Sequence, residues 1–158
     1  MAARVVRRGM EPVAQVLSDP QAVYPRGIAA VRLSVPGGGQ LMVSTIHLAL
    51  QQDNRVTHAR EAVERVRRAG CPVVMGGDLN ETADGPARRI LDEVLRDPAE
   101  PTEHTFPATR PRRRIDAVLV TPGLRVRTAR ALRSAPGVPA ARMRTASDHL
   151  GTVVDLDI

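Results

Sequence analysis

The sequence contains no lysine and no tryptophan, and it has only one cysteine, one tyrosine and one phenylalanine. A single cysteine, Cys71, cannot form a disulfide within the chain, and its position beside Pro72 predicts ordinary packing. With Tyr24 and Phe106 as the only aromatic residues, the chain lacks a stacking platform for single-stranded bases. No apolar run is long enough to span a bilayer, and the start of the chain has no apolar segment of the signal-peptide kind. We therefore expect a reducing, cytoplasmic location.

The charged residues are present in unequal numbers. All 23 basic residues are arginine, against 17 acidic residues, which leaves a formal charge of +6. Positive charge favours a phosphate-rich partner such as nucleic acid. The complete bias towards arginine, however, reflects genome composition better than phosphate recognition. Charge alone therefore makes a phosphate-rich substrate only modestly more plausible and does not name one.

The length of 158 residues and the hydrophobic content of 42% predict one globular domain, residues 1–158, with a real core. Alternation and short apolar runs predict strands, and apolar residues at helical spacing predict helices. We expect strands at 13–17, 28–35, 40–46, 73–75, 115–120, 125–132 and 154–158, helices at 56–66 and 86–95, and long loops at 96–114 and 134–146. Strands thus outnumber helices, and one strand-helix-strand unit is mixed with hairpins. This pattern indicates a layered α/β architecture.

Polar residues of catalytic type stand at the ends of four predicted strands. A carboxylate that follows a buried strand is unfavourable unless it meets a positive partner, such as a metal, the cation of a phosphate or a histidine. Each residue alone also has an ordinary structural explanation, because Asp-X-Asn is common in turns and a histidine after a strand often has a structural role. The residues are His47, Asp78, Asn80, Asp116, Asp148 and His149.

Together and in this order, the segments that contain these residues resemble the endonuclease/exonuclease/phosphatase superfamily. These proteins are metal-dependent phosphoesterases and include deoxyribonuclease I. The resemblance covers roughly residues 28–158, and four motifs in order are specific for the superfamily but not for one member. The matching segments are STIHL at 44–48, GGDLN at 76–80, RIDAVL at 114–119 and SDHL at 147–150, together with HTFP at 104–107.

The resemblance implies a catalytic role for several of these side chains. Asp78 would position or deprotonate the attacking water. Asp116 would hydrogen-bond His149, fixing its tautomer and favouring its charged form. His149 would then stabilise negative charge on the phosphoryl oxygens. His47 would contact the phosphate or protonate the leaving group, and Asn80 would hold the phosphate or a metal.

The resemblance also implies a divalent cation as cofactor. Mg²⁺ or Mn²⁺ prefers oxygen ligands, and the implied ligands are Asp78, Asn80 and Asp148. Family members also carry an asparagine and then a metal-binding glutamate on strands upstream of the histidine segment. Glu11 is the only acid near that position, and Pro12 argues against its standing in a buried strand.

The fold implied is a layered α/β sandwich of mixed β-sheets flanked by helices, as in deoxyribonuclease I. We expect this chain to be incomplete at its N-terminus and to supply one sheet and part of the other, either as a truncated protein or as a natural short form. The exposed inner face of such an incomplete sandwich would be an apolar patch.

Three functions are open. The first is a divalent-metal-dependent hydrolase of phosphodiester or phosphomonoester bonds, acting on nucleic acid, a phospholipid head group or a small phosphodiester. The second is a non-catalytic fragment or phosphate-binding module of the same fold, which has lost the upstream glutamate. The third is a basic nucleic-acid-binding protein, for which the run Arg112-Arg113-Arg114 and the net charge argue, although a solvated face explains that run equally well.

Overall fold

The computed structural model of the protein describes residues 13–18 and 24–158. Glu11, the candidate metal ligand near the start of the chain, lies outside these residues. Within the described residues, the elements in chain order are β1 (Val13–Val16), β2 (Gly27–Ser34), β3 (Gln40–His47), α1 (Gln52–Arg67), β4 (Val73–Asp78), α2 (Pro86–Leu91), β5 (Asp116–Val120), β6 (Arg125–Ala131), α3 (Ala140–Ala146) and β7 (Thr152–Asp157).

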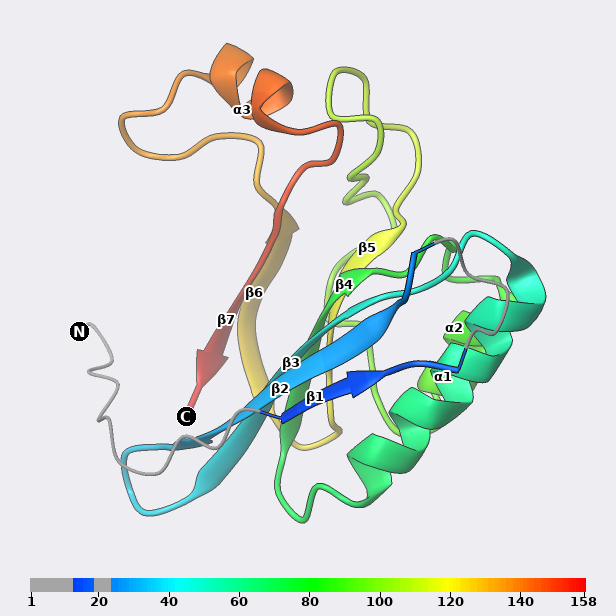
Figure 1. Cartoon of the computed structure of the whole chain (residues 1–158). Coiled ribbons are helices and arrows are strands. Elements are labelled where there is room, and N and C mark those ends of the chain that lie inside the picture. Colours follow the sequence, from blue (N-terminus) through cyan, green and yellow to red (C-terminus); the bar gives the residue numbers. More distant parts are fainter. Residues whose placement is uncertain (1–12, 19–23) are drawn as a thin grey trace.

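The first five strands form one mixed sheet in the order β1-β2-β3-β4-β5 (Figure 1). β1 pairs with β2, and β2 with β3, in antiparallel fashion. β3 and β4 are parallel because α1 carries the chain back to the start of the sheet between them. β5 then runs antiparallel to β4. As a result, β3 and β4 end at the same edge of the sheet at which β5 begins.

Helices α1 and α2 cover one face of this sheet (Figure 1). α1 carries an apolar stripe at helical spacing, formed by Ala59, Val63 and Val66, and all three are buried. The main core lies between the helices and the sheet, because the larger cluster of buried apolar side chains is there. Burying each valine, leucine or isoleucine contributes roughly 1.5–3 kcal/mol. The buried side chains that the sheet contributes to this core are Ile28, Met42, Ile46, Val73, Met75 and Leu119.

The second sheet is antiparallel, is formed by β6 and β7, and packs against the other face of the first sheet (Figure 1). Between the two sheets lies a smaller core, in which Val74 and Val120 are buried against Leu156. The central strand β4 is therefore buried on both faces over its apolar residues, as its sequence predicts. Val73 and Met75 face the helices, and Val74 faces the second sheet.

Two local predictions were wrong. α2 ends at Leu91 and not at residue 95, because the N–H groups of Glu93 and Val94 donate to carbonyl oxygens three residues back, both at 3.2 Å, so the chain continues in turns. Residues 134–146 are not all loop, because they contain α3. Three of the seven residues of α3 are alanine, the strongest helix former, and Pro139 stands directly before its first turn.

The predicted fold class is confirmed, because mixed sheets and flanking helices form a layered α/β sandwich (Figure 1). The first sheet is large and the second has two strands within the described residues. The single domain over residues 1–158 and the incomplete N-terminus stay predictions. None of the helices among the described residues is both long enough and apolar enough to cross a membrane.

Candidate functional site

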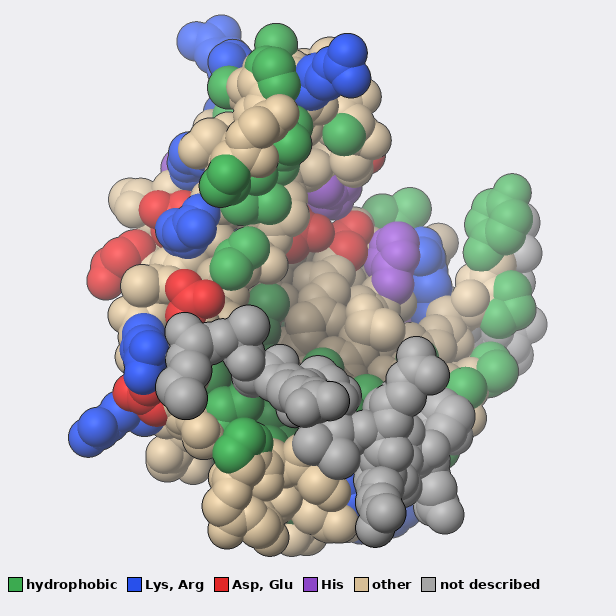
Figure 2. Space-filling model, turned by 90° about the vertical axis from the view of Figure 1, so that its left-hand side faces the viewer, with side chains coloured by type: hydrophobic (Ala, Val, Ile, Leu, Met, Phe, Trp, Pro, Cys, Tyr) green, Lys and Arg blue, Asp and Glu red, His purple; other side chains and the backbone are tan. Residues whose placement is uncertain are grey.

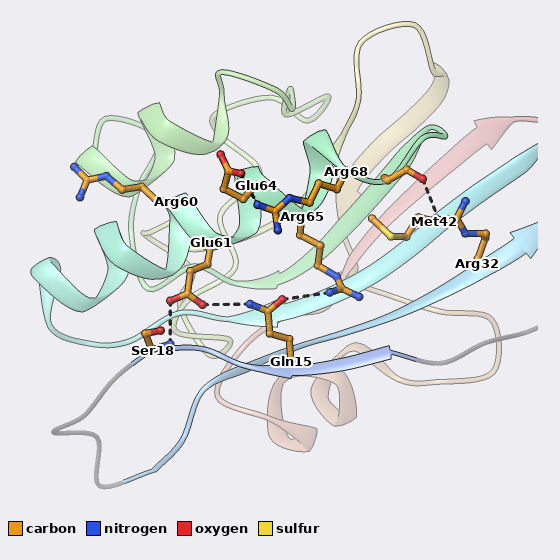
Figure 3. A pocket seen from close by; sticks show the side chains of 10 residues that line it. Gln15, Ser18, Arg32, Met42, Arg60, Glu61, Glu64, Arg65 and Arg68 are labelled. Atoms are coloured by element: carbon orange, nitrogen blue, oxygen red, sulfur yellow. Dashed lines mark hydrogen bonds and ion pairs between the residues drawn. The ribbon is translucent and has the colours of Figure 1, made fainter.

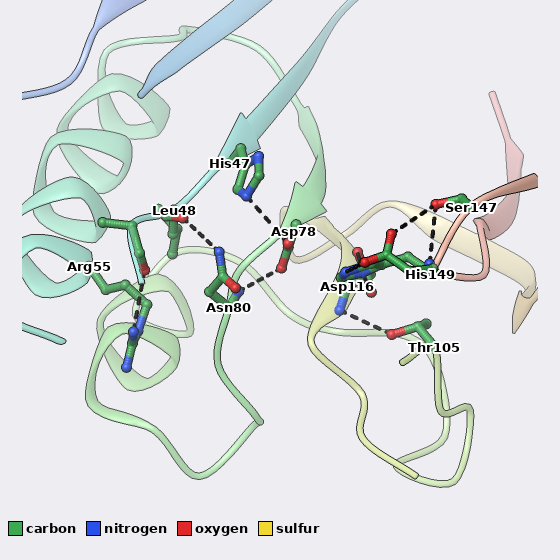
Figure 4. A network of polar contacts seen from close by, with 11 residues as sticks. His47, Leu48, Arg55, Asp78, Asn80, Thr105, Asp116, Ser147 and His149 are labelled. Carbon is green, nitrogen blue, oxygen red and sulfur yellow. Dashed lines mark hydrogen bonds and ion pairs between the residues drawn. The ribbon is translucent and has the colours of Figure 1, made fainter. Parts of the chain in front are cut away.

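Three of the predicted site residues stand in one row across neighbouring strands. His47 is the last residue of β3, Asp78 the last of β4 and Asp116 the first of β5. The strand register pairs His47 with Asp78 and Asp78 with Asp116. Paired residues project from the same face of a sheet, here the face that carries the second sheet. His47 Nε2 consequently lies 3.3 Å from Asp78 Oδ2 (Figure 4).

The loop after β4 holds the Asp-X-Asn motif in a defined turn. At Gly77 the backbone of β4 approaches β3 so closely that an added Cβ would lie 1.7 Å from Ile46 O, which explains the glycine. Asn80 has φ 51°, in the left-handed region that asparagine tolerates. Its N–H donates to Asp78 Oδ1 at 2.8 Å and its Nδ2 to Leu48 O at 2.9 Å (Figure 4). The turn therefore fixes Oδ1 of Asp78 and presents Oδ2 to the neighbouring histidine.

The fourth side chain comes from the segment before β7. His149 Nδ1 lies 2.9 Å from Oδ2 and 3.1 Å from Oδ1 of Asp116 (Figure 4). The imidazole also packs against the ring of Phe106, with 4.7 Å between the ring centroids. With Nδ1 donating to the carboxylate, the Nε2 atom is the one left for a ligand. Two segments that are 33 residues apart along the chain thus form one carboxylate–imidazole pair.

The electrostatic surroundings shift the pKa values of His149 and His47 in opposite directions. Burial lowers the pKa of His149, but the hydrogen bond and charge of Asp116 outweigh it, so the pKa lies above the ordinary 6.5. Burial likewise lowers the pKa of His47, and the positive charge of Arg26 lowers it further. The attraction of Asp78 does not compensate, so the pKa of His47 lies below 6.5. The surroundings therefore favour the charged form of His149 and the neutral form of His47.

A hollow of about 450 Å³ opens beside the end of β4, and Asp78, Asp116 and His149 are among the residues that line it. In the space-filling view, acidic and histidine side chains surround a recess of the surface (Figure 2). The three side chains each offer a ligand atom, and these atoms lie within 4.8 Å of one another. Carboxylate oxygens and an imidazole nitrogen are donors that Mg²⁺ or Mn²⁺ accepts. The residue types and spacing therefore fit a divalent cation.

The remaining predicted site residues lie around this hollow and not among its lining residues. His47 contacts Asp78 but lines a second hollow, beside β1 and β2. Asn80 turns its amide nitrogen towards the segment after β3. Asp148 has a side chain that is 81% exposed, with Oδ2 lying 4.0 Å from His149 Nε2. Three predicted residues therefore line one hollow. His47 is connected to them by its contact with Asp78, and Asn80 and Asp148 lie at the margin.

Thr105 supports the site in a way that the sequence did not reveal. Its side chain is fully buried, and its Oγ1 accepts N–H groups from Ile115 and Asp116, both at 3.4 Å (Figure 4). Its carbonyl oxygen accepts the N–H of Leu150 at 2.8 Å. Thr105 therefore connects the start of β5 to the residue that follows His149. In the sequence it is visible only as one letter of the HTFP segment.

A buried ion pair supports the other half of the site. Glu81, directly after the Asp-X-Asn turn, is 5% exposed. Its Oε1 accepts from Arg55 Nε of α1 at 3.1 Å and its Oε2 from the N–H of Arg88 at 3.0 Å. Arg55 also donates to the carbonyl oxygens of Ala49 and Leu50. The loops after β3 and β4 are thereby tied to both helices, which no short sequence motif indicates.

The arginine run at 112–114 divides into two kinds of residue. Arg112 and Arg113 are exposed, as a solvated face or a phosphate-binding surface would require. Arg114 is 8% exposed and donates to both oxygens of Asp97, with Nη2 2.7 Å from Oδ1. Arg88 donates to Asp97 Oδ2 as well, at 3.1 Å. Arg114 is therefore a structural residue that holds the chain just before β5.

A larger hollow, of about 570 Å³, lies between α1 and the edge of the sheet formed by β1 and β2 (Figure 3). Its central polar groups bind one another. Gln15 Nε2 donates to Glu61 Oε2 at 3.3 Å, and Arg65 Nη1 donates to Gln15 Oε1 at 3.2 Å. The N–H of Ser18 donates to Glu61 Oε1 at 3.1 Å. These contacts attach β1 to α1, and we assign this α1 groove a structural role.

Comparison with known proteins identifies the family of the chain. Residues 11–149 match the sequence model described as the Endonuclease/Exonuclease/phosphatase family, which covers most of the chain. None of the curated proteins that were compared matches the chain.

Solved structures share the fold at low sequence identity. A mannosyl-6-phosphatase from Bacteroides thetaiotaomicron is 23% identical with a TM-score of 0.77, and the match covers 94% of this chain and 66% of that one. The human Nocturnin catalytic domain with bound sulfate is 18% identical with a TM-score of 0.71, covering 94% and 59%. D. rerio TDP2 complexed with single strand DNA product is 16% identical with a TM-score of 0.69, covering 94% and 69%. This chain thus spans about two thirds of the length of such proteins.

Proposed function

The chain belongs to the endonuclease/exonuclease/phosphatase family, and from this premise we propose that it is a divalent-metal-dependent hydrolase of phosphate esters. The observation that supports the proposal most is the row of His47, Asp78 and Asp116 with His149 hydrogen-bonded to its end. Hydrolysis of a phosphate ester needs a group that orients or deprotonates water, positive charge for the phosphoryl oxygens and a proton for the leaving oxygen. The row and His149 together supply candidate side chains for these needs.

Asp78 orients the attacking water or takes its proton. His149 supplies positive charge to the phosphoryl oxygens through Nε2, because Asp116 occupies Nδ1 and raises the pKa of the imidazole. His47 contacts the phosphate or protonates the leaving group. The lowered pKa of His47 favours the first of these roles, because the second requires the protonated imidazole.

A bound Mg²⁺ or Mn²⁺ would supply positive charge for the phosphoryl oxygens and would lower the pKa of a water molecule. We assign the cation to Asp78, which belongs to the donor cluster, and, as the family resemblance implies, to Asn80 and Asp148 at its margin. Asp116 also lies within the donor cluster. Both of its oxygens face His149 Nδ1, so we assign Asp116 to the hydrogen bond with the imidazole and not to the cation. In Asn80 the amide nitrogen donates to Leu48 O, which leaves the amide oxygen as the ligand atom.

Two classes of phosphate ester are candidate substrates. The structural neighbours include a mannosyl-6-phosphatase and a protein complexed with a single strand DNA product. Both phosphomonoesters and phosphodiesters are therefore candidate substrates of this chain, and a test of the proposal has to present both.

The experiment measures hydrolysis of bis-p-nitrophenyl phosphate and of p-nitrophenyl phosphate by the purified chain with Mn²⁺ or Mg²⁺. We expect turnover that EDTA abolishes, and the faster of the two substrates identifies the ester class. Asp78→Ala should lower kcat by about 10²–10⁴, as loss of a general base usually does. Asp53→Asn, which changes an acidic residue in the first turn of α1 that is not among the residues lining the hollow, is the matched control and should retain full activity.

Two results would contradict the proposal. If Asp78→Ala hydrolyses as fast as the unmodified chain, the activity belongs to another site or to a contaminant. If neither ester is hydrolysed while Mn²⁺ and phosphate still bind, the chain is the non-catalytic phosphate-binding module.

A further inference from the structure

One group of buried charges takes no part in the proposed chemistry. Its centre is Asp97, in the segment between α2 and β5. Asp97 Oδ1 accepts from Arg114 Nη2 at 2.7 Å. Asp97 Oδ2 accepts from Arg114 Nη1 and, at 3.1 Å, from Arg88 Nη2. The side chains of these three residues, which we call the Asp97 cluster, are at most 12% exposed.

The carboxylate of Asp97 stays ionised in spite of its burial. Burial raises the pKa of Asp97, but the hydrogen bond and charge of Arg114 outweigh it, together with the N–H of Ala99 and the charge of Arg88. The pKa therefore lies below the ordinary 3.8. Two N–H groups of one guanidinium that donate to the two oxygens of one carboxylate fix the orientation of both groups. Asp97 thus forms a rigid connection between the elements that carry its partners.

One end of the cluster leads to the start of β5. Arg114 stands two residues before Asp116. The carbonyl oxygen of Ile115, between them, accepts the N–H of Leu79 at 2.8 Å, and Leu79 directly follows Asp78. A displacement of the chain at Arg114 would therefore reach both carboxylates of the candidate site.

The other end of the cluster leads to the loop after β4. Arg88 belongs to α2, and its N–H donates to Glu81 Oε2 at 3.0 Å. Glu81 stands three residues after Asp78. A continuous series of buried contacts, from Glu81 through Arg88 and Asp97 to Arg114, consequently connects the two loops from which the site carboxylates project.

The segment that carries Asp97 is itself fixed to β5. The N–H of Arg96 donates to Val120 O at 2.8 Å, and the N–H of Val120 donates to Arg96 O at 2.9 Å. Val120 is the last residue of β5. Asp97 therefore holds the start of this strand from a backbone that is anchored at the other end of the same strand.

We propose that Asp97 is a positioning residue of the candidate site. Through Arg114 it fixes the start of β5. Asp116, the first residue of that strand, in turn orients His149. Through Arg88 it fixes the loop after β4. The inference rests on the proposed function and adds to it a residue that is not among those lining the hollow. Because a misplacement of about 1 Å can lower a rate about a hundredfold, such a support should be visible in kcat.

Two variants disturb the cluster. Asp97→Asn removes the carboxylate that Arg88 and Arg114 share, which leaves two buried cations side by side. Arg114→Lys keeps every charge but replaces the planar two-point contact with a single ammonium group, so it should fold even if Asp97→Asn does not. The matched control is Arg113→Lys, the same change at the exposed arginine next to it. Val63→Ala, at a buried residue of α1, is the control for lost stability.

The first readout is the tautomer of His149 in the metal-free chain, which needs no turnover. When the imidazole is neutral, the nitrogen chemical shifts of Nδ1 and Nε2 report which of the two carries the proton. We expect Asp116 to hold the proton on Nδ1 in the unmodified chain. In Asp97→Asn and Arg114→Lys a measurable fraction should move to Nε2, and both controls should keep the tautomer of the unmodified chain.

The second readout is hydrolysis of the preferred nitrophenyl ester with Mn²⁺. We expect Arg114→Lys to lower kcat about tenfold with KM little changed, because the cluster orients catalytic groups and does not line the hollow. Val63→Ala should lower the free energy of unfolding in urea and leave kcat as it is. Arg113→Lys should change neither quantity.

The proposal is overturned if His149 has the same tautomer in Arg114→Lys, in Arg113→Lys and in the unmodified chain. It is also overturned if Val63→Ala lowers kcat as much as Arg114→Lys does, because lost stability would then explain both effects. A failure of the proposed function looks different. In that case the unmodified chain hydrolyses no ester with any metal, while the tautomer of His149 still distinguishes Arg114→Lys from Arg113→Lys.

Discussion

The hollow at Asp78 and the α1 groove both have charged side chains in their lining, and the groove is the larger, at about 570 against 450 Å³. In the groove, a carboxylate is satisfied by an amide and a backbone N–H, so its polar groups hold two elements together. In the hollow, two carboxylates and an imidazole meet from three separate segments. Asp116 shifts the pKa of His149 upward, whereas burial shifts the pKa of His47 downward. Convergent titratable groups, and not size, therefore locate the chemistry.

The largest effect should come from removing the imidazole that carries positive charge. His149→Ala should lower kcat for the preferred ester by about 10²–10⁴, because charge stabilisation of the phosphoryl oxygens is lost. Glu61→Gln in the α1 groove should leave kcat unchanged. His104→Gln is the matched histidine control, since His104 lies outside the residues that line the hollow. Equal rates for His149→Ala and His104→Gln would show that the hollow is not the active site.

A smaller loss is expected at Thr105, which positions the carboxylate–imidazole pair without touching substrate. Thr105→Val removes the acceptor of the N–H groups of Ile115 and Asp116, and an unsatisfied buried donor costs about 1–3 kcal/mol. We expect kcat to fall about tenfold with KM little changed, and Thr105→Ser to restore it. In an Asp116→Asn background, Thr105→Val should add little. Fully additive losses would mean that Thr105 stabilises the fold without acting through Asp116.

The protonation of His149 offers a test that needs no turnover. In the metal-free chain, NMR of the imidazole Cε1–H should give a pKa above 6.5 for His149 and below 6.5 for His47. In Asp116→Asn the pKa of His149 should fall, because burial then acts without the opposing carboxylate. Since the folded pKa of His149 is raised, its protonation stabilises the folded chain below pH 6.5, and this contribution is lost as pH rises through the folded pKa. An unchanged pKa in Asp116→Asn would contradict this assignment.

The smallest effect belongs to the α1 groove. Glu61→Gln weakens the contacts to Gln15 and Ser18, and because these groups are partly exposed, the free energy of unfolding should fall by about 0.5–1 kcal/mol. Urea denaturation measures the change, with Glu100→Gln, at an exposed glutamate outside the groove, as the control. A loss of hydrolysis without a loss of stability would show that the groove has a catalytic role after all.

Much of the fold could be predicted because its markers are local. The apolar run of β4 stands between Pro72 and two glycines, and α1 shows an apolar stripe before Gly70. α3 was missed because Pro136, Gly137 and Pro139 indicated a loop, although the alanines after them favour a helix.

The candidate site was only partly visible in the sequence. His47, Asp78 and Asp116 could be placed at strand ends, but their alignment in one row depends on the register of three strands. Thr105 accepts hydrogen bonds from residues 10 and 11 positions away. Arg114 pairs with Asp97 across 17 positions. Such contacts follow from tertiary packing and have no local pattern.

The most direct test of the central claim is the rate of hydrolysis of the preferred nitrophenyl ester as Mn²⁺ is raised. The unmodified chain and Glu61→Gln should show the same saturable activation. Asp78→Asn should need more Mn²⁺ and reach only a small fraction of the rate, because its side chain is assigned to both the water and the cation. Three superimposable curves, or a rate that is indifferent to Mn²⁺, would contradict the account.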